Sequence, residues 1–343
     1  MSNNTRRKTF RKVITSPELT TQINPDNIKM MERFLKNYST KRSPKSVIVY
    51  RSNLTIFFTW NLLNNGNIFF VNIKKLDLMD FFDYCVTELQ WKSARYQQMH
   101  SCLSSFSTWI ENFFDDEYPN FRNLLPKIEK LPKEVARKKS VFTKEELDGL
   151  MLNLKKEGRI QEQCLLALMM SSGSRASELC RFRIDIIDEN NTAFEDLFLE
   201  TTEEIQVKGR GVNGKHLIRY ILKDTFLPYY HKWLPIRKEI MEKNNQNHNF
   251  IFIKKNGEPA NTDMIKGWTV KWNQYLDKPF YIHSIRHFYT TSLLKIGLEQ
   301  ELVQNIVGWE SADMVKVYDD SKPDERKWKG LNKLKNALEN NII

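Results

Sequence analysis

With 343 residues, the chain is longer than one typical domain, which predicts two domains with separate cores. Hydrophobic residues make up 41% of the sequence and charged residues 28%, a balance that excludes overall disorder. The formal net charge of +11 indicates a polyanionic partner, and nucleic acid is the first candidate.

No apolar run reaches the roughly 18 to 20 residues that span a bilayer, so we expect no membrane partner. The N-terminus MSNNTRRKTFRKV also lacks the apolar segment of a signal peptide, which predicts a protein of the cytoplasm. The cysteines lack the paired spacing of zinc or redox sites, and we expect reduced, mostly buried thiols at Cys85, Cys102, Cys164 and Cys180.

Residues 1–23 predict a basic arm, either a solvated tail or a DNA contact, because Arg and Lys dominate them and the first acidic residue is Glu18. Residues 24–125 predict a helical domain. Its clearest stripe at helical spacing predicts core positions at Tyr96, Met99, Leu103, Phe106, Trp109, Ile110 and Phe113. Basic residues cluster near predicted helix starts, where backbone N–H groups favour phosphate, and candidate DNA contacts are Arg42, Lys45, Arg51, Lys92 and Arg95.

Residues 126–140 predict a basic interdomain linker, because they contain two prolines and show no sustained periodicity. Its Lys138 and Lys139 join the candidate DNA contacts. The second domain, residues 141–343, is expected to open with a helix at the capping box formed by Thr143 and Glu146.

Within this domain, Gly173 is expected to end one helix and place Arg175 in the first turn of the next. Two β-like runs, residues 204–208 and 217–222, flank a glycine-rich GRGVNG and predict a hairpin. Lys208 would end its first strand, and Lys215 is its nearest rival. After residue 262 the pattern is helical again and closes with an amphipathic segment at Trp328, Leu331, Leu334 and Leu338. The fold class is therefore mainly α with a small antiparallel β-sheet.

Chemistry on a phosphodiester requires a nucleophile, cations for the developing charge and an acid for the leaving oxygen. Arg175 and Arg286 can make bidentate bonds to phosphoryl oxygens. In HSIRHFYTT, the side chains of His283, Arg286 and His287 lie on one helical face. The two histidines could share a cation, but no carboxylate or thiol lies nearby in the sequence, so we expect no metal site.

Taken singly, these residues have simpler explanations. An arginine is more often an ion-pair partner, a tryptophan such as Trp309 is usually core, and a tyrosine such as Tyr318 or Tyr289 is commonly structural. No single structural explanation predicts the whole set in this order.

The order R-x-x-E-L, hairpin lysine, H-x-x-R-H, G-W and tyrosine resembles the tyrosine recombinase (phage integrase) family from Arg175 to Tyr318. The resemblance implies an N-terminal helical core-binding domain followed by an α+β catalytic domain that together clamp duplex DNA. By position, the residues similar to the family's catalytic set are Arg175, Lys208, His283, Arg286, Trp309 and Tyr318. Trp309 stands where most members have histidine and Cre-type members have tryptophan. Glu178 resembles an acidic residue that buttresses the first arginine, and His287 is a further supporting residue.

The resemblance also implies the reaction. Tyr318 would attack the scissile phosphate to form a 3′-phosphotyrosine, His283 would accept its proton, and Lys208 would protonate the leaving 5′-oxygen. Neither a metal nor a cofactor would be needed. We expect a site-specific recombinase of a phage or mobile element, acting on specific duplex sites as a tetramer at the bacterial nucleoid. Two alternatives stay open: a DNA-binding regulator that has lost recombination, and a type IB topoisomerase-like relaxing enzyme.

Overall fold

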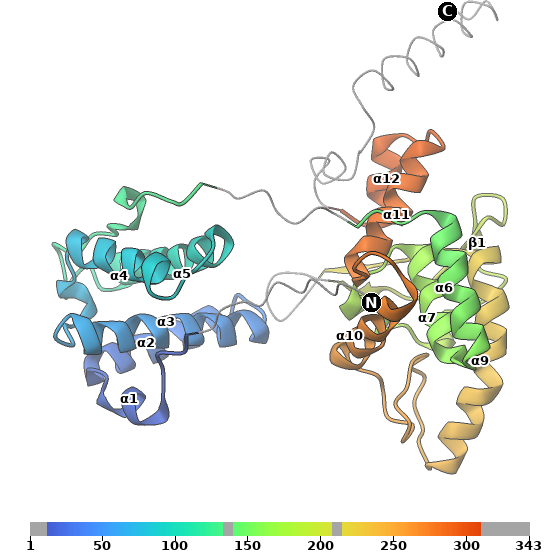
Figure 1. The fold of residues 1–343 in the computed structure, drawn as a ribbon, viewed down its shortest axis with the longest axis horizontal. Coiled ribbons are helices and arrows are strands. Elements are labelled where there is room, and N and C mark those ends of the chain that lie inside the picture. The colour runs from blue at the N-terminus through green and yellow to red at the C-terminus, as the bar shows by residue number, and fades with distance from the viewer. Residues whose placement is uncertain (1–11, 133–139, 208–214, 310–343) are drawn as a thin grey trace, which may run out of the picture. The chain divides into compact units, whose positions relative to one another are not determined.

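The computed structural model describes residues 12–132, 140–207 and 215–309, and the chain divides into two compact units (Figure 1). None of the helices in these ranges combines the length and the apolar character needed to cross a membrane.

Every element that the structure describes in the N-terminal unit is a helix. In chain order these are α1 (Pro17–Gln22), α2 (Pro25–Ser39), α3 (Pro44–Asn64), the 3₁₀ helix η1 (Phe70–Asn72), α4 (Lys75–Thr87), α5 (Ser93–Phe113) and the 3₁₀ helix η2 (Leu125–Lys127). The first three share one start signal, a proline at the first helical position preceded by a polar capping residue.

The core of this unit is aromatic. Phe57, Phe81 and Phe106 are completely buried, and the rings of Phe57 and Phe81 meet edge to face with centroids 4.9 Å apart. The predicted stripe on α5 is confirmed at most of its positions. Its last member, Phe113, ends α5 and is 59% exposed, whereas the next residue, Phe114, is buried in the core.

Two segments next to the predicted helical domain contribute to its core. The segment predicted as an arm contains α1, because the Ser16 hydroxyl accepts a hydrogen bond from the Leu19 N–H and caps the helix. Ile23 is then buried in the core. The segment predicted as a linker begins with η2 and buries Ile128 against the same core, so its first residues pack on the N-terminal unit.

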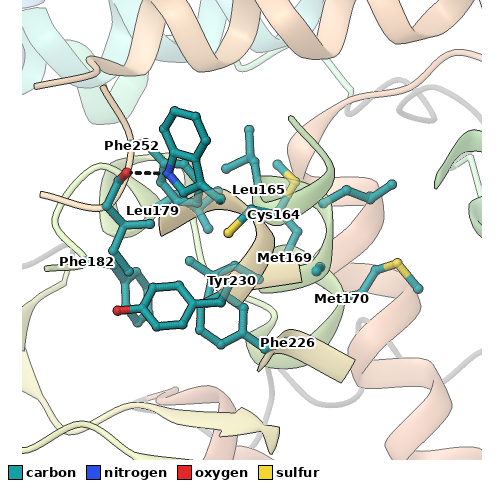
Figure 2. Packing of buried hydrophobic residues seen from close by; sticks show 14 of the residues in the cluster. Cys164, Leu165, Met169, Met170, Leu179, Phe182, Phe226, Tyr230 and Phe252 are labelled. Atoms are coloured by element: carbon teal, nitrogen blue, oxygen red, sulfur yellow. Dashed lines mark hydrogen bonds between the residues drawn. The ribbon is translucent and has the colours of Figure 1, made fainter. Parts of the chain in front are cut away.

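The C-terminal unit surrounds a central helix. Its helices are α6 (Lys144–Lys156), α7 (Ile160–Ser172), α8 (Ala176–Leu179), η3 (Ile184–Ile186), α9 (Lys223–Lys243), α10 (Thr262–Lys271), η4 (Trp272–Tyr275), α11 (Ile282–Lys295) and α12 (Gln300–Val307). Residues 163–172 of α7 are all buried, and this helix packs against α6, α9, α11 and the strand β5. Figure 2 shows Cys164, Leu165 and Met169 of α7 among the surrounding aromatic side chains. A helix that is apolar on every side is expected at the centre of a domain.

Among the described residues of this unit, five short strands form two antiparallel sheets. One sheet has the order β1 (Thr192–Ala193), β2 (Phe198–Glu200), β5 (Tyr220–Leu222), and the other pairs β3 (Ile205–Gln206) with β4 (His216–Leu217). The run 217–222, predicted as one strand, is therefore divided between two sheets. The division falls at Arg219, whose backbone N–H and carbonyl both bond to Thr201, at 3.0 Å each.

The predictions about capping and cysteines are confirmed. The Thr143 hydroxyl and the Glu146 carboxylate cap α6 reciprocally. All four cysteines are free thiols, and only Cys180 is not fully buried.

Candidate active site

Gly173 turns the chain from α7 into the segment that carries Arg175. Its φ of 57° is left-handed, and it ends α7 as predicted. A Cβ atom at this position would lie 2.5 Å from Cδ1 of Tyr289. Both the backbone conformation and the close ring of Tyr289 therefore require glycine.

Arg175 is held by Glu178. The Glu178 carboxylate accepts one hydrogen bond from the Arg175 backbone N–H at 3.2 Å and another from its guanidinium at 2.7 Å. Glu178 is fully buried, whereas the side chain of Arg175 is 22% exposed. These two bonds hold the backbone and one guanidinium nitrogen of Arg175, while part of the side chain stays exposed.

Burial would raise the pKa of Glu178, but the charges of Arg219 and Arg175 outweigh burial and hold this pKa below its ordinary value. Glu178 is therefore an ionised carboxylate at neutral pH. It has the buttressing position that the resemblance implied.

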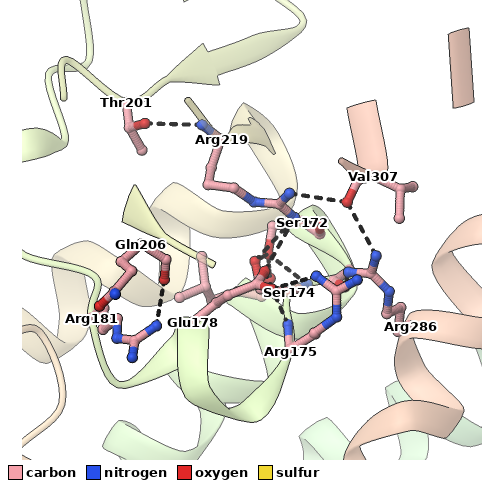
Figure 3. Close-up of polar contacts among 12 residues, drawn as sticks. Ser172, Ser174, Arg175, Glu178, Arg181, Thr201, Gln206, Arg219, Arg286 and Val307 are labelled. Atoms are coloured by element: carbon pink, nitrogen blue, oxygen red, sulfur yellow. Dashed lines mark hydrogen bonds and ion pairs between the residues drawn. The ribbon is translucent and has the colours of Figure 1, made fainter. Parts of the chain in front are cut away.

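Arg286 reaches the same region from α11. Only 2% of this residue is exposed, and its guanidinium donates to the Gly173 carbonyl at 2.8 Å and to the Val307 carbonyl at 3.1 Å. The guanidinium also lies 5.4 Å from the ring centroid of Trp309, a cation–π distance. Arg286 thus bonds to the loop that carries Arg175. Gly173, the loop residue that accepts this bond, is 113 positions away from Arg286 in the sequence (Figure 3).

Trp309 is placed by the end of α12. Gly308 ends this helix with a φ of 77°, and the Trp309 N–H bonds back to the Gln304 carbonyl at 3.0 Å. Trp309 is buried in a small apolar cluster with Phe198, Val303 and other residues. The carbonyl of Val307 ends α12 and has no partner within its own helix. A helix C-terminus favours cations, and the Arg286 guanidinium donates to this carbonyl.

The two histidines of α11 lie at different depths. His283, in the first turn, is exposed, whereas His287 is 5% exposed and its Nδ1 lies 3.2 Å from the Thr291 hydroxyl. The difference arises because α11 packs against both α7 and α12, so its later turns are enclosed. Of the two, only His283 has an open side toward solvent.

Several predicted residues lie outside the described residues: Lys208, Tyr318, Lys138 and Lys139. Lys215, the rival of Lys208, is half-buried, and its carbonyl accepts the Val207 N–H at 2.7 Å beside β3. Tyr289 is a core residue, 2% exposed, and burial raises the pKa of its hydroxyl. A hydroxyl so enclosed is not a candidate nucleophile.

The candidate DNA contacts of the N-terminal unit fall into two groups. Arg42, Lys45 and Lys92 are exposed, and each lies just before or within the first turn of a helix. Arg51 lies further along α3 and pairs with Glu32. Arg95 is half-buried, stacks on Trp91 and donates to Asn53.

Arg219 was not recognised as a functional candidate from the sequence. It is the only charged residue in the run LIRYIL. This isolated charge was the available signal, but the run was interpreted only as a strand of the hairpin. In the structure it is fully buried and meets Glu178, Ser172 and Val307 (Figure 3). In the described ranges, no group of three or more His, Cys, Asp and Glu side chains is arranged to hold a metal ion.

The chain is similar to known recombinases. It is 24% identical over 295 residues to the tyrosine recombinase XerC of Psychromonas ingrahamii, covering 84% of this chain and 90% of that protein. It is 22% identical over 283 residues to the tyrosine recombinase XerD of Oceanobacillus iheyensis, covering 80% of this chain and 87% of that protein.

Two solved structures share the fold. One is the XerH site-specific recombinase bound to difH substrate, with a TM-score of 0.64 and 15% identity over 90% of this chain and 96% of that one. The other is the Tn1549 transposon integrase in complex with transposon right end DNA, with a TM-score of 0.64 and 14% identity over 90% of this chain and 99% of that one. A model of the phage integrase family matches residues 140–325, more than half of the chain. The chain therefore belongs to the phage integrase family.

Proposed function

We propose that this protein is a site-specific DNA recombinase of the integrase or resolvase type, which cleaves and rejoins DNA through a 3′-phosphotyrosine at Tyr318. The observation that carries the proposal is the convergence of Arg175 and Arg286 on the Gly173 loop, with Trp309 against the second guanidinium. Two guanidiniums from distant segments at one place suit a phosphoryl group better than two separate surface ion pairs.

Electrostatics support a role in stabilising the transition state. Three guanidiniums, those of Arg175, Arg219 and Arg286, gather around the single carboxylate of Glu178, which leaves a surplus of positive charge. A pentacoordinate phosphorane carries more negative charge than the ground-state phosphodiester. Fixed cations in a region shielded from water therefore favour the transition state over the ground state.

The Tyr318 oxygen forms a bond to phosphorus while the bond from phosphorus to the 5′-oxygen breaks. No energy source is consumed, because the phosphotyrosine ester keeps the energy of the phosphodiester bond. The tyrosine proton passes to His283, which the structure leaves exposed at the start of α11. Lys208 protonates the leaving 5′-oxygen, and the reverse reaction with a second DNA end rejoins the strand.

The same proposal covers partners and architecture. Residues 24–125 would be the core-binding domain and residues 141–343 the catalytic domain, joined by the basic segment 126–140. The foremost DNA contacts are the exposed Arg42, Lys45 and Lys92. Strand exchange between two specific duplex sites needs four cleavages and therefore four protomers. The protein would act at the nucleoid, in the cytoplasm. The DNA in the XerH and Tn1549 integrase complexes supports a duplex DNA partner.

The test is covalent trapping. Duplexes recovered by selection from a randomised pool would be rebuilt with a nick near each candidate scissile position, so that the cleaved fragment diffuses away. We expect a protein–DNA adduct linked to the 3′ end, absent in Tyr318→Phe and retained in the control Tyr289→Phe. Tight binding to selected duplexes without any adduct would contradict the proposal and indicate a regulator instead.

A further inference from the structure

Arg219 joins the three segments that make up the arginine site. Its guanidinium donates to the Ser172 carbonyl at 2.9 Å and to the Val307 carbonyl at 3.1 Å. Its backbone is bonded to Thr201, between β4 and β5. One residue therefore connects the end of α7, the end of α12 and the junction between β4 and β5.

Arg219 also shares its partners with both proposed phosphate-binding arginines. The Val307 carbonyl accepts from Arg219 and from Arg286, at 3.1 Å in each case. The Glu178 carboxylate, bonded to Arg175 at 2.7 Å, lies 3.8 Å from the Arg219 guanidinium. Each phosphate-binding arginine is thus separated from Arg219 by only one shared acceptor.

The sharing of Glu178 has an electrostatic consequence. If Arg175 alone faced this buried carboxylate, the pair would be neutral and Arg175 would attract an anion weakly. Because Arg219 is a second cation beside Glu178, the group of Arg175, Glu178 and Arg219 has a net positive charge. Although burial lowers the pKa of Arg219, a guanidinium remains protonated at neutral pH.

We propose that Arg219 is a positioning residue for phosphate binding: it orients Arg286 through Val307 and keeps Arg175 available by sharing Glu178. This inference rests on the proposed function, since it assigns Arg219 to the same site. Arg219 itself does not touch the DNA in this account. Its side chain is only 1% exposed.

The fit around Arg219 is close. A Cβ atom on Gly308 would lie 3.0 Å from Nη1 of Arg219 and 2.6 Å from Cδ1 of Leu217. The space beside Nη1 is therefore narrow, and Nη1 and Nη2 each donate a hydrogen bond to a backbone carbonyl. A lysine at this position would keep the charge, but its single ammonium could not reproduce the planar fork.

A matched control exists in the same unit. Arg237 is 6% exposed and donates to two backbone carbonyls, those of Phe250 at 2.8 Å and His248 at 2.5 Å. It resembles Arg219 in burial and bonding but meets none of the site residues. Arg237→Met therefore reports the cost of removing a buried structural arginine.

The first readout is the affinity of the full-length protein for inorganic phosphate. It is measured from the shift of the indole N–H resonance of Trp309 during a phosphate titration, and Trp309→Phe assigns that resonance. We expect Arg219→Met to weaken phosphate binding about tenfold or more, because a unit charge near the anion is lost at an effective dielectric of about 20. Arg237→Met should lower the melting temperature and leave phosphate affinity unchanged. Arg175→Ala and Arg286→Ala show whether the resonance reports the site.

The second readout is the single-turnover rate of adduct formation on the nicked duplex, measured beside duplex affinity. Arg219→Lys should keep most of the phosphate affinity and still cleave at least about tenfold more slowly, because it loses the fork. Duplex affinity should change much less than the cleavage rate.

The possible outcomes separate the two proposals. If Arg219→Met folds and binds phosphate with wild-type affinity, the role of Arg219 alone is overturned. If Arg219→Met does not fold, cleavage by Arg219→Lys at the wild-type rate overturns that role. If the wild-type protein binds no phosphate, or if its binding survives both Arg175→Ala and Arg286→Ala, the proposed function fails and the role of Arg219 fails with it.

Discussion

Gly173 combines two constraints at one residue, a left-handed backbone and a neighbouring ring. Gly173→Ala should destabilise the C-terminal unit by about 3 kcal/mol, since backbone strain of about 1 kcal/mol adds to overpacking against Tyr289. Gly158→Ala is the control, because Gly158 also has positive φ, at +66°, but has no atom near the added methyl group. Urea unfolding of both variants measures the difference, and equal losses would show that Tyr289 imposes no constraint.

Glu178 makes stability depend on pH. Its pKa in the folded protein lies below the ordinary value of 4.5, so its charge stabilises the fold above that pH, and this contribution is lost as the pH falls through the folded value. Glu178→Gln should therefore cost about 3 kcal/mol near pH 7, because it leaves buried guanidiniums without their carboxylate.

As the pH falls below 4.5, the difference in free energy of unfolding between wild type and Glu178→Gln should narrow. It should be lost once the pH passes below the lowered pKa of folded Glu178, because the wild-type carboxyl is then protonated too. The free energy of unfolding, measured across this range, checks the prediction. Glu242→Gln, at an exposed position on α9, should follow the wild-type curve throughout. A constant difference between wild type and Glu178→Gln at all pH values would contradict the assignment.

At the residue scale, sequence reasoning identified the residues that stand in motifs. Arg175, Glu178, Arg286 and Trp309 follow a recognisable order, and the structure brings them together. Arg219 was missed, because its burial results from contacts with α7 and α12, segments far away in the sequence. Local pattern carries no information about such contacts.

At the scale of elements, α6 offers a direct test of its capping box. Thr143→Ala should destabilise the C-terminal unit by about 1 kcal/mol, because the Glu146 N–H loses its acceptor at the helix start. Thr202→Ala, at an exposed threonine that caps none of the described helices, should change stability by less than about 0.5 kcal/mol. If both substitutions have the same effect in urea unfolding, the cap does not stabilise α6.

Helices were predictable from sequence to a greater extent than strands. Capping residues and proline mark the starts of α3 and α6 locally. The strands are two or three residues long and pair across many positions, so β1 and β2 left no usable pattern. The single run 217–222 became two strands because Arg219 turns inward between them.

At the scale of the whole molecule, the apolar spacing, the capping signal and the two β-like runs were enough to predict a mainly helical chain with a small antiparallel sheet. The ends of the helical segments were less predictable. Ile23 and Ile128, both assigned to segments outside the N-terminal core, are buried in it, because a core recruits apolar residues wherever the chain returns to it.

The central claim is that Arg175 and Arg286 act on one phosphate, and the most direct test is the single-turnover rate of adduct formation on the selected nicked duplex. We compare wild type with Arg175→Lys, Arg286→Lys and the double variant, and use Arg183→Lys, an ion-paired surface arginine, as the control. Each single variant should cleave about 100-fold more slowly while duplex affinity changes little, as for the loss of one preorganised donor. The double variant should lose less than the product of the two single losses, because the two groups act as a unit. Cleavage at the wild-type rate by either single variant would contradict the account.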